Sequence, residues 1–306
     1  MTFPLLPKDI DVFERGWLSS NNIFFDDGQT SGLIDSGYST HSAQTLALVE
    51  AKLGARPLDV LINTHLHSDH CGGNRALQDK YPSLITLIPP GQAKFVKDWD
   101  AASLTYDATG QQCPQFGYSH ILLPGASIRL GSYSWDILAA PGHDPDAILL
   151  FEASRRILIS GDALWENGFG VVFPELEGAN AFNDVGATLD LIESLTPEIV
   201  IPGHGRVFRY TPSVVSIARQ RLDAFVANPA KHARHAVKVL LKFKLLEVQQ
   251  QSIEQFNEWA QRTPYLNACR KRFFNELEFV LFIEKMCAEL VDSDVARITD
   301  KVIYNA

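Results

Sequence analysis

The amino-acid sequence predicts an α/β protein with a mainly helical C-terminal region, and three observations support this. Short apolar runs separated by turn residues alternate with helical patterns over residues 1–208, which is typical of α/β layering. From residue 209 onward the apolar positions recur at helical spacing instead. The length of 306 residues suits one large domain or two modest ones. We therefore expect one domain over residues 1–208 and a helical region over residues 209–306.

Turn residues bound each expected strand of the first region. These strands are Val12–Phe25, Gly32–Asp35, Leu58–Thr64, Ile128–Ala139, Ala147–Phe151, Arg156–Ser160 and Glu198–Ile201. Ser42–Leu53 is an expected helix, because Gly54 can take the left-handed C-terminal cap. The second region is expected to hold the helices Pro212–Ala227, Lys231–Gln250, Ile253–Arg262 and Tyr265–Val291, and then a short hairpin over Val295–Tyr304.

Composition excludes several classes of protein. With 46% hydrophobic and 21% charged residues, the chain is not disordered, collagen-like or a coiled coil. No apolar run approaches the roughly 18 residues that a bilayer span needs, and the N-terminus lacks the basic-then-apolar order of a signal peptide. Four cysteines without a C-x-x-C pair argue against a disulfide scaffold. We therefore expect a cytoplasmic protein with no membrane partner.

The net charge of -9 is unevenly distributed along the chain. Residues 209–306 carry 15 Lys and Arg against 11 Asp and Glu, and subtraction from the totals of 27 and 36 leaves 12 against 25 for residues 1–208. Eight basic residues and one acid lie between Arg209 and Lys244. The acidic average argues weakly against a nucleic-acid partner, but the basic stretch keeps that partner open.

The densest chemical signal is the run Thr64-His65-Leu66-His67-Ser68-Asp69-His70, which directly follows an expected strand. His65 and His67 are two residues apart, so on an extended segment they project the same way. Three imidazoles and a carboxylate in six residues are costly to bury without a partner. Neutral imidazole and carboxylate groups are ligands for zinc, iron or manganese. The run therefore predicts a metal site.

Three further strands end in a candidate ligand. His143 follows Ala140-Pro141-Gly142, Asp162 follows Ser160-Gly161, and His204 follows Pro202-Gly203. The glycines permit close approach of the backbone to the site. Together with the first run, these positions give five histidines and two aspartates, which suits two metals sharing a carboxylate better than one four-coordinate ion.

These motifs resemble those of the metallo-β-lactamase superfamily of hydrolases, including Asp35 in Leu-Ile-Asp-Ser-Gly, and the resemblance spans about residues 10–208. The run Thr64–Gly73 is most similar to the glyoxalase II (hydroxyacylglutathione hydrolase) and thioesterase-like branch. The resemblance implies a four-layer αβ/βα sandwich with a C-terminal α-helical region. It also implies two divalent metal ions, with zinc expected first and iron or manganese as alternatives.

The resemblance further implies a role for each motif residue. His65, His67 and His143 would hold one metal, and Asp69, His70 and His204 the other, with Asp162 bridging. Asp69 would also act in catalysis, by orienting the nucleophile or by handling its proton. Asp35 would hold a ligand histidine through the other ring nitrogen. Cys71 is interpreted as a small residue that fills space beneath the loop.

Four residues are assigned to substrate binding. Trp165 and Phe169 follow Asp162 and are expected in an apolar acyl pocket, with core packing as the equal alternative. Arg234 and Lys238 are assigned to the anionic thiol carrier, because glyoxalase II-like enzymes use basic residues of a C-terminal helical region in this way. A solvated helix face is the plainer interpretation of the same charges. The C-terminal region also resembles a winged helix, and its place at the substrate mouth or in a homodimer stays open.

The function implied is hydrolysis of a small-molecule substrate, in which a metal-bound hydroxide attacks a carbonyl carbon. The first expectation is a thioesterase acting on an acyl-glutathione or acyl-coenzyme A, followed by an esterase or lactonase for small substrates. One alternative is a nuclease or phosphodiesterase that uses the basic C-terminal region. Another is a metal-bound signalling protein with little turnover.

Overall fold

The computed structural model describes residues 6–306 and divides the chain into two compact units. Of the described residues, the first unit contains 6–100 and Cys113–Leu222, and the second contains Ala101–Gln112 and Asp223–Ala306. The expected domain boundary after residue 208 stays a prediction, because compactness alone does not show which segments fold independently. In the described part of the chain, no helix combines the length and the apolar character that crossing a membrane requires.

Two six-stranded mixed sheets form the centre of the first unit. The first sheet contains, in spatial order, β1 (Ile10–Phe13), β2 (Asn22–Asp26), β3 (Ser31–Ile34), β4 (Val60–Ile62), β5 (Ile85–Ile88) and β6 (His120–Ile121). The second contains β12 (Phe208–Arg209), β11 (Ile199–Pro202), β10 (Ile157–Gly161), β9 (Ile148–Glu152), β8 (Tyr133–Ala139) and β7 (Ser127–Leu130). Strands β3 to β6 are parallel, as are β10 and β11, so their carboxyl ends share one edge.

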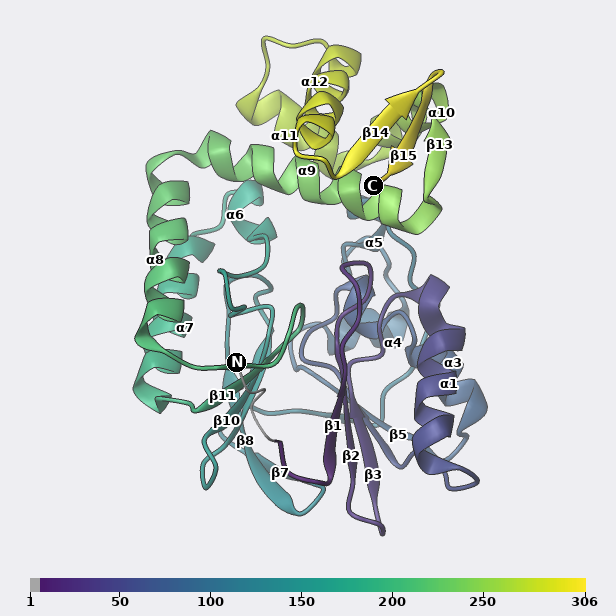
Figure 1. The fold of residues 1–306 in the computed structure, drawn as a ribbon, viewed down its shortest axis with the longest axis vertical. Helices are drawn as coiled ribbons and strands as arrows, with labels where there is room; N and C mark the ends of the chain where they lie inside the picture. Colours follow the sequence, from purple (N-terminus) through teal and green to yellow (C-terminus); the bar gives the residue numbers. More distant parts are fainter. Residues whose placement is uncertain (1–5) are drawn as a thin grey trace. The chain divides into compact units, whose positions relative to one another are not determined.

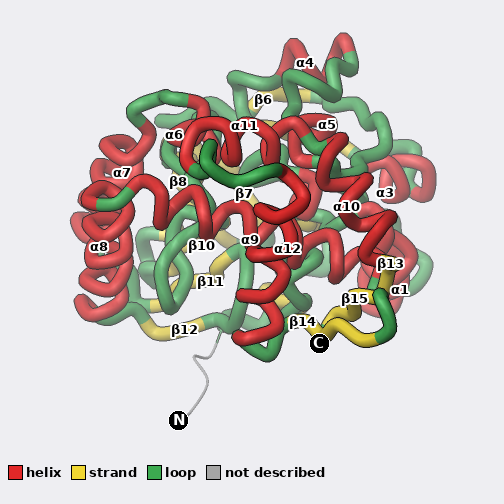
Figure 2. The backbone as a smooth tube through the Cα atoms, turned by 90° about the horizontal axis from the view of Figure 1, so that it is seen from above, coloured by secondary structure: helices red, strands yellow, loops and turns green. Residues whose placement is uncertain are grey.

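Helices cover the outer faces of both sheets, as Figure 1 shows. The helices of the first unit are α1 (Ser42–Leu53), α2 (Ser68–Cys71), α3 (Asn74–Lys80), α4 (Ala93–Asp98), α6 (Phe173–Glu177) and α7 (Ala181–Leu195), with a 3-10 turn η1 (Ser39–His41). Helix α8 (Pro212–Ala227) begins in the first unit and lies beside α7 in both views (Figure 1, Figure 2). Arg219 of α8 pairs with Asp190 and Glu193 of α7. This arrangement confirms the predicted αβ/βα sandwich.

Alternation along the strands divides the apolar side chains between two cores. Ile23 and Phe25 of β2 point into the cluster between the sheets, where Trp135 and Ile159 of the second sheet also lie. Phe24, between them in sequence, joins the outer cluster that holds residues of α1 and α3. The two sheets therefore pack face to face, and this packing positions the loops that follow their carboxyl ends.

The second unit is mainly helical with one small sheet. Its elements are α5 (Tyr106–Thr109), α9 (Pro229–Val248), β13 (Gln250–Ser252), α10 (Ile253–Arg262), α11 (Pro264–Phe273), α12 (Phe279–Asp292), β14 (Ala296–Thr299) and β15 (Val302–Asn305). The order of the sheet is β13-β15-β14, and the expected C-terminal hairpin is its β14-β15 pair. Its resemblance to a winged helix stays a prediction.

Three expected elements were wrong, because each is two elements in the structure. The strand expected over Ile128–Ala139 is the antiparallel pair β7 and β8, since the chain turns between them at Gly131, which has a φ of 57°. The single helix over Tyr265–Val291 is two helices, because Phe274 leaves the helical conformation at φ -141° and turns inward to stack on Phe282. The single strand over Val12–Phe25 is two antiparallel strands. The segment between them, including Ser19 and Asn21, is buried through hydrogen bonds of its polar groups rather than through strand pairing.

Candidate metal centre

Every histidine and aspartate expected as a ligand follows the end of a strand in the first unit. Strand β4 ends at Ile62, and the chain then passes His65 and His67 in extended or turning backbone. The one-turn helix α2 carries Asp69 and His70. The remaining three follow strands of the second sheet: His143 after β8, Asp162 after β10 and His204 after β11.

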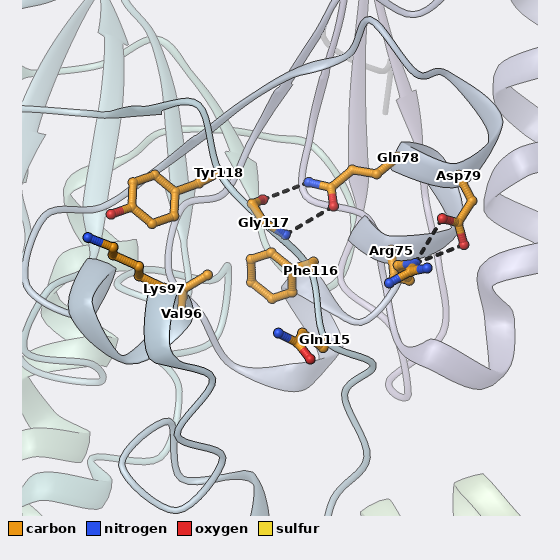
Figure 3. A pocket seen from close by; sticks show the side chains of 9 residues that line it. All are labelled: Arg75, Gln78, Asp79, Val96, Lys97, Gln115, Phe116, Gly117 and Tyr118. Atoms are coloured by element: carbon orange, nitrogen blue, oxygen red, sulfur yellow. Dashed lines mark hydrogen bonds and ion pairs between the residues drawn. The ribbon is translucent and has the colours of Figure 1, made fainter.

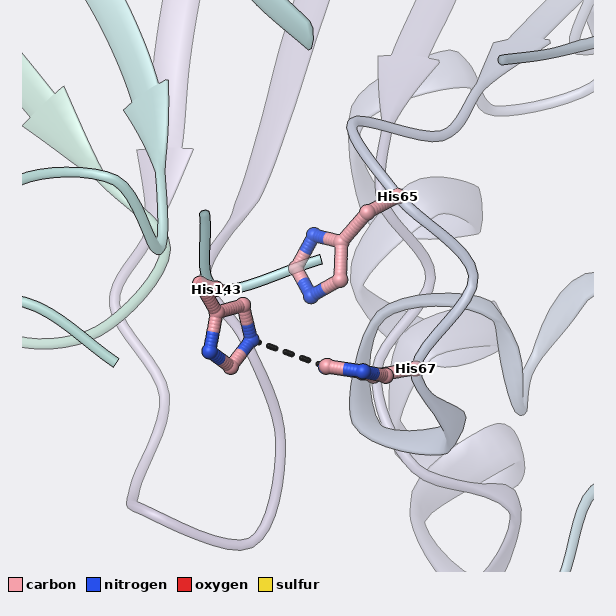
Figure 4. Close-up of side chains that lie close together, drawn as sticks. All are labelled: His65, His67 and His143. Carbon is pink, nitrogen blue, oxygen red and sulfur yellow. Dashed lines mark hydrogen bonds between the residues drawn. The ribbon is translucent and has the colours of Figure 1, made fainter. Parts of the chain in front are cut away.

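The first group of imidazoles comes from both sheets. In Figure 4, His65 and His67 project from one side toward His143 on the other. The Nδ1 of His67 lies 2.8 Å from the Nε2 of His143, and the ring centroids of His65 and His143 are 5.0 Å apart. One ligand atom from each residue fits within a span of 4.8 Å.

Two further groups share members with the first. One ligand atom from each of His65, His70 and Asp162 lies within 4.8 Å of the other two, and the same holds for Asp69, His70 and His204. Asp162 faces both sides of the cluster: its Oδ1 is 3.4 Å from Nε2 of His70, and its Oδ2 is 3.4 Å from Nε2 of His143. The seven side chains therefore form one continuous donor set.

Hydrogen bonds on the far side of the rings orient them. Nδ1 of His143 lies 2.5 Å from the carbonyl oxygen of Val171, and Nδ1 of His70 lies 2.8 Å from Oδ2 of Asp35. Asp35 also accepts hydrogen bonds from the backbone N–H and the hydroxyl of Thr64. These contacts favour a proton on Nδ1, which leaves the Nε2 lone pairs of both histidines aimed into the cluster.

Glycine allows the backbone to approach this cluster closely. A Cβ on Gly203 would lie 2.3 Å from Oδ1 of Asp162, and a Cβ on Gly170 would lie 2.5 Å from Nδ1 of His143. Real Cβ atoms do not occupy such distances, so any larger residue would displace the ligand side chain. The approach at Gly203 is the one that the Pro202-Gly203-His204 pattern predicted, whereas the glycine of Pro141-Gly142-His143 packs against Val185 instead.

Burial and neighbouring charges set the protonation states of the cluster. Burial lowers the pKa of His67 and of His143 to about 4, and lowers that of His65 well below its usual value. Burial acts in the same direction on His70, but the carboxylates of Asp162, Asp35 and Asp69 raise its pKa well above the ordinary value. At neutral pH the first three imidazoles are thus neutral, as metal ligands must be.

The carboxylates of the cluster stay ionised. Burial favours the neutral acids, but the charges of His204 and His70 hold the pKa of Asp162 well below its usual range. The same two histidines lower the pKa of Asp69 against the effect of burial. The cluster therefore combines the neutral imidazoles of His65, His67 and His143 with the anionic oxygens of Asp69 and Asp162, a donor set suited to zinc, iron or manganese.

Asp144 and Trp17 lie at the cluster, although the sequence analysis assigned them no role. Asp144 is buried, accepts a hydrogen bond from Gln92, and lies 3.7 Å from Nε2 of His67. Its position directly after His143 was an available signal. Trp17 stacks on the ring of His204, and no pattern in the neighbouring sequence predicts this contact.

The two aromatic residues assigned to substrate lie in different surroundings. The indole N–H of Trp165 donates to Oδ1 of Asp162 at 3.2 Å, and its ring is partly exposed. Phe169 is buried, with the guanidinium of Arg221 5.5 Å from its ring centroid. Both are near the cluster, and their contact with substrate stays a prediction.

Most basic side chains of the 209–244 stretch are engaged in internal contacts. Arg234 and Lys238 both pair with Glu289, at 2.6 and 3.2 Å, within the second unit. Lys242 donates to the C-terminal segment, and Lys244 pairs with Glu247. The assignment of Arg234 and Lys238 to a thiol carrier stays a prediction, and their pairing supports the plainer interpretation.

Cys71 is fully buried, with its Sγ 3.3 Å from the carbonyl oxygen of His67. Its sulfur lies 3.8 Å from that of Cys113, and all four cysteines are free thiols. This placement beneath the loop agrees with a space-filling residue.

A larger hollow of about 600 Å³ lies between α3, α4 and residues 115–118 (Figure 3). None of the seven clustered residues lines it. Its polar groups mainly pair with one another: Gln78 forms two hydrogen bonds with the backbone of Gly117, and Arg75 pairs with Asp79.

A small cavity of about 10 Å³ lies at the histidine cluster, where it is lined by His143, Asp162 and Phe169 among others. We place the chemistry at the histidine cluster, because only there do unsatisfied donor atoms of the described residues converge.

Comparison with known proteins agrees with this geometry. The chain is 26% identical over 60% of its length to a probable hydroxyacylglutathione hydrolase of Schizosaccharomyces pombe, and it spans 61% of that protein. It is 24% identical over 64% of its length to an acyl-coenzyme A thioesterase of Gallus gallus, of which it spans 77%. Curated relatives are thus similar at low identity.

Two solved structures are similar in fold. A beta-lactamase domain protein from Burkholderia ambifaria has a TM-score of 0.60 at 19% identity, covering 99% of this chain and 94% of the other. A protein crystallised in a di-iron-bound form has a TM-score of 0.52 at 25% identity, covering 68% of this chain and 96% of the other. The model of the metallo-beta-lactamase superfamily matches residues 15–204, the segment that carries six of the seven clustered ligands in sequence and ends on the seventh, His204. The chain therefore belongs to the metallo-beta-lactamase superfamily, as its histidine and aspartate motifs predicted.

Proposed function

We propose that this chain is a hydrolase that holds two divalent metal ions and cleaves a thioester of the acyl-glutathione or acyl-coenzyme A type. The observation that carries the proposal is the continuous set of seven donors in which Asp162 faces both sides of the cluster. The names of the yeast and chicken relatives support a thioester over other substrates. A small ester or lactone is the next candidate.

The donor set fits metal ions by a test that is independent of any family pattern. Nε2 of His65 and Nε2 of His70 are buried and have no hydrogen-bond partner. An unpartnered buried polar atom costs about 1–3 kcal/mol, and a cation would remove that cost. His65, His67 and His143 would hold one ion, and Asp69, His70 and His204 the other, with Asp162 between them. The di-iron form of the similar solved structure supports two ions rather than one.

When bound, the two ions would lower the pKa of a water molecule toward about 7 and polarise the substrate carbonyl. The chain contributes orientation. Asp69 is anionic and lies 3.1 Å from Nε2 of His204, so its other oxygen can accept a hydrogen bond from the attacking water. Trp165 fixes Asp162 through its indole N–H, and Asp35 fixes His70.

The internal pairing of Arg234, Lys238, Lys242 and Lys244 bears on the nuclease alternative. Nucleic-acid affinity depends on cations free to neutralise phosphates, and these four charges are already compensated or bonded. The observation favours a small-molecule substrate. Cytoplasmic location and a homodimer stay proposals on the sequence grounds given above.

The experiment is a hydrolysis panel on purified protein reconstituted separately with zinc, iron and manganese. The panel contains acyl-glutathione and acyl-coenzyme A thioesters, a lactone, bis-p-nitrophenyl phosphate and single-stranded RNA. We expect up to two metals per chain by elemental analysis and the highest kcat/KM on a thioester. Full activity without metal, or turnover of the phosphodiesters alone, would contradict the proposal.

A further inference from the structure

An exposed tryptophan borders the cluster. Trp17 lies in the loop between β1 and β2, and 58% of its surface is exposed. Its ring is parallel to the imidazole of His204, with centroids 5.4 Å apart and an interplanar angle of 9°. It also meets the edge of Trp165 at 5.3 Å. Trp17 and Trp165 together present aromatic surface beside the histidine cluster, and apolar side chains next to convergent polar groups are typical of a ligand-binding surface.

The loop that carries Trp17 is held rigidly against both halves of the cluster. The backbone N–H of Ser20 donates to the carbonyl oxygen of Asp69, and that of Asn21 donates to the carbonyl oxygen of Gly203. The side-chain amide of Asn21 donates to Pro202 and Gly205. Ser20 and Asn21 are fully buried, whereas the ring of Trp17 lies on His204 and Trp165 with its other surface exposed. Its exposure is therefore a property of a fixed loop and not of a loose one.

Aromatic groups also flank the opposite side. The ring of Phe173 is 5.8 Å from that of His67 and 6.4 Å from that of His143. Trp17 and Trp165 form one apolar wall and Phe173 forms another, with the ligand imidazoles between them.

We infer that Trp17 and Trp165 form the subsite for the acyl group of the substrate, and that this subsite prefers a flat apolar acyl group, such as an aromatic one, over a small or hydroxylated one. The inference rests on the proposed thioester hydrolysis and narrows its substrate class. The indole face offers stacking worth about 0.5–1.5 kcal/mol beyond area burial. It offers no hydrogen-bond acceptor for a hydroxyacyl group.

The test compares benzoyl-coenzyme A with acetyl-coenzyme A, which share one carrier, on the metal-loaded enzyme. The variants are Trp17→Ala, Trp17→Phe and, as a matched control, Leu123→Ala, since Leu123 is also exposed and contacts none of the cluster in any described interaction. We expect Trp17→Ala to lower kcat/KM about 10-fold on benzoyl-coenzyme A and at least five times less on acetyl-coenzyme A. Trp17→Phe should recover most of the difference, and Leu123→Ala should change neither value by more than about twofold.

Two results on activity would overturn the inference. An equal loss on both substrates, or a loss of bound metal in Trp17→Ala, would mean that Trp17 only supports His204. An unchanged benzoyl-to-acetyl ratio would mean that no acyl group contacts it.

A binding measurement separates this inference from the proposed function. If the unsubstituted protein hydrolyses no thioester, calorimetric titration with benzoate still tests the subsite. Binding that Trp17→Ala weakens at least fivefold would keep the subsite and reject only the thioesterase. Binding that is absent, or unchanged in Trp17→Ala, would reject the subsite as well.

Discussion

Replacing Asp35 by asparagine should remove metal from the Asp69–His70–His204 group while leaving the fold intact. The Asp35 side chain is 1% exposed and accepts three hydrogen bonds, from the N–H and hydroxyl of Thr64 and from Nδ1 of His70. Its backbone is left-handed at φ 58°, a conformation that asparagine tolerates better than alanine. Asparagine keeps the oxygen that faces the N–H of Thr64, but it presents an amide N–H to His70.

That exchange reverses the hydrogen bond to His70. The imidazole must then accept at Nδ1 and carry its proton on Nε2, the atom that faces Asp162. A protonated Nε2 cannot bind metal, and loss of such an orienting partner costs about 10- to 100-fold in affinity. Asp35→Ala should act differently, because it leaves the N–H of Thr64 and the Nδ1–H of His70 unpaired, whereas the Thr64 hydroxyl still lies 3.1 Å from Nδ1 of His65. The two lost hydrogen bonds should lower the free energy of unfolding by about 2–6 kcal/mol.

The assay is metal content per chain by elemental analysis after dialysis against a graded series of metal-buffer concentrations. Asp59→Asn is the control, because Asp59 accepts hydrogen bonds from the N–H and hydroxyl of Ser31 just as Asp35 does from Thr64. We expect Asp35→Asn to require about 10- to 100-fold more free metal for half-loading of one site. Loading equal to that of the unsubstituted protein, or an equal shift in Asp59→Asn, would refute the role given to Asp35.

Three further predictions follow from the geometry. The free energy of unfolding of the metal-free protein should fall as pH drops from about 6.5 to 4, because burial lowers the pKa of His67 and of His143 to about 4 in the folded protein. In this range the unfolded chain binds protons that the folded chain excludes. A free energy of unfolding that does not change with pH, measured by chemical denaturation, would contradict this prediction. Gly203→Ala should reduce both the bound metal and the activity, because the new Cβ would displace Asp162. A variant that binds as much metal as the unsubstituted protein would contradict this prediction. Phe274→Ala should lower the free energy of unfolding by about 3–5 kcal/mol, because Phe274 is a buried aromatic side chain at the end of α11. A change below about 1 kcal/mol in a urea titration would contradict this packing.

Local sequence signals were sufficient for much of the fold. The bounds of Ser42–Leu53, Pro212–Ala227 and Ile253–Arg262 as helices agree with the structure, because a glycine, a proline or a turn residue marks each end. The strands that precede His65, His143, Asp162 and His204 were also found as short apolar runs. Since parallel and neighbouring strands bring their ends to one edge, the pattern indicated the cluster before any distance was known.

The features that the sequence did not show depend on contacts between distant segments. The break at Phe274 is decided by its stacking on Phe282, which periodicity within one helix cannot indicate. Residues 101–112 join the second compact unit although they interrupt the first in sequence. Trp17 is one aromatic residue in a loop, and only the long-range bonds of Ser20 and Asn21 place it against His204.

The charges of the C-terminal region show the same limit. An excess of Lys and Arg over residues 209–244 kept a nucleic-acid partner open at the level of composition. Glu289 lies more than fifty residues beyond Arg234, yet it pairs with both Arg234 and Lys238. Counting charges along a segment cannot reveal that neutralisation, because the counter-charge comes from another helix.

The most direct test of the proposed thioesterase is the kcat/KM of the zinc-, iron- or manganese-loaded protein on acyl-coenzyme A and acyl-glutathione thioesters, compared with Asp162→Ala prepared in the same way. We predict thioester turnover that requires metal and falls by at least about 100-fold in the variant, together with loss of bound metal, since Asp162 faces both halves of the cluster. Absence of thioester turnover with every metal, alongside cleavage of RNA or bis-p-nitrophenyl phosphate, would contradict it.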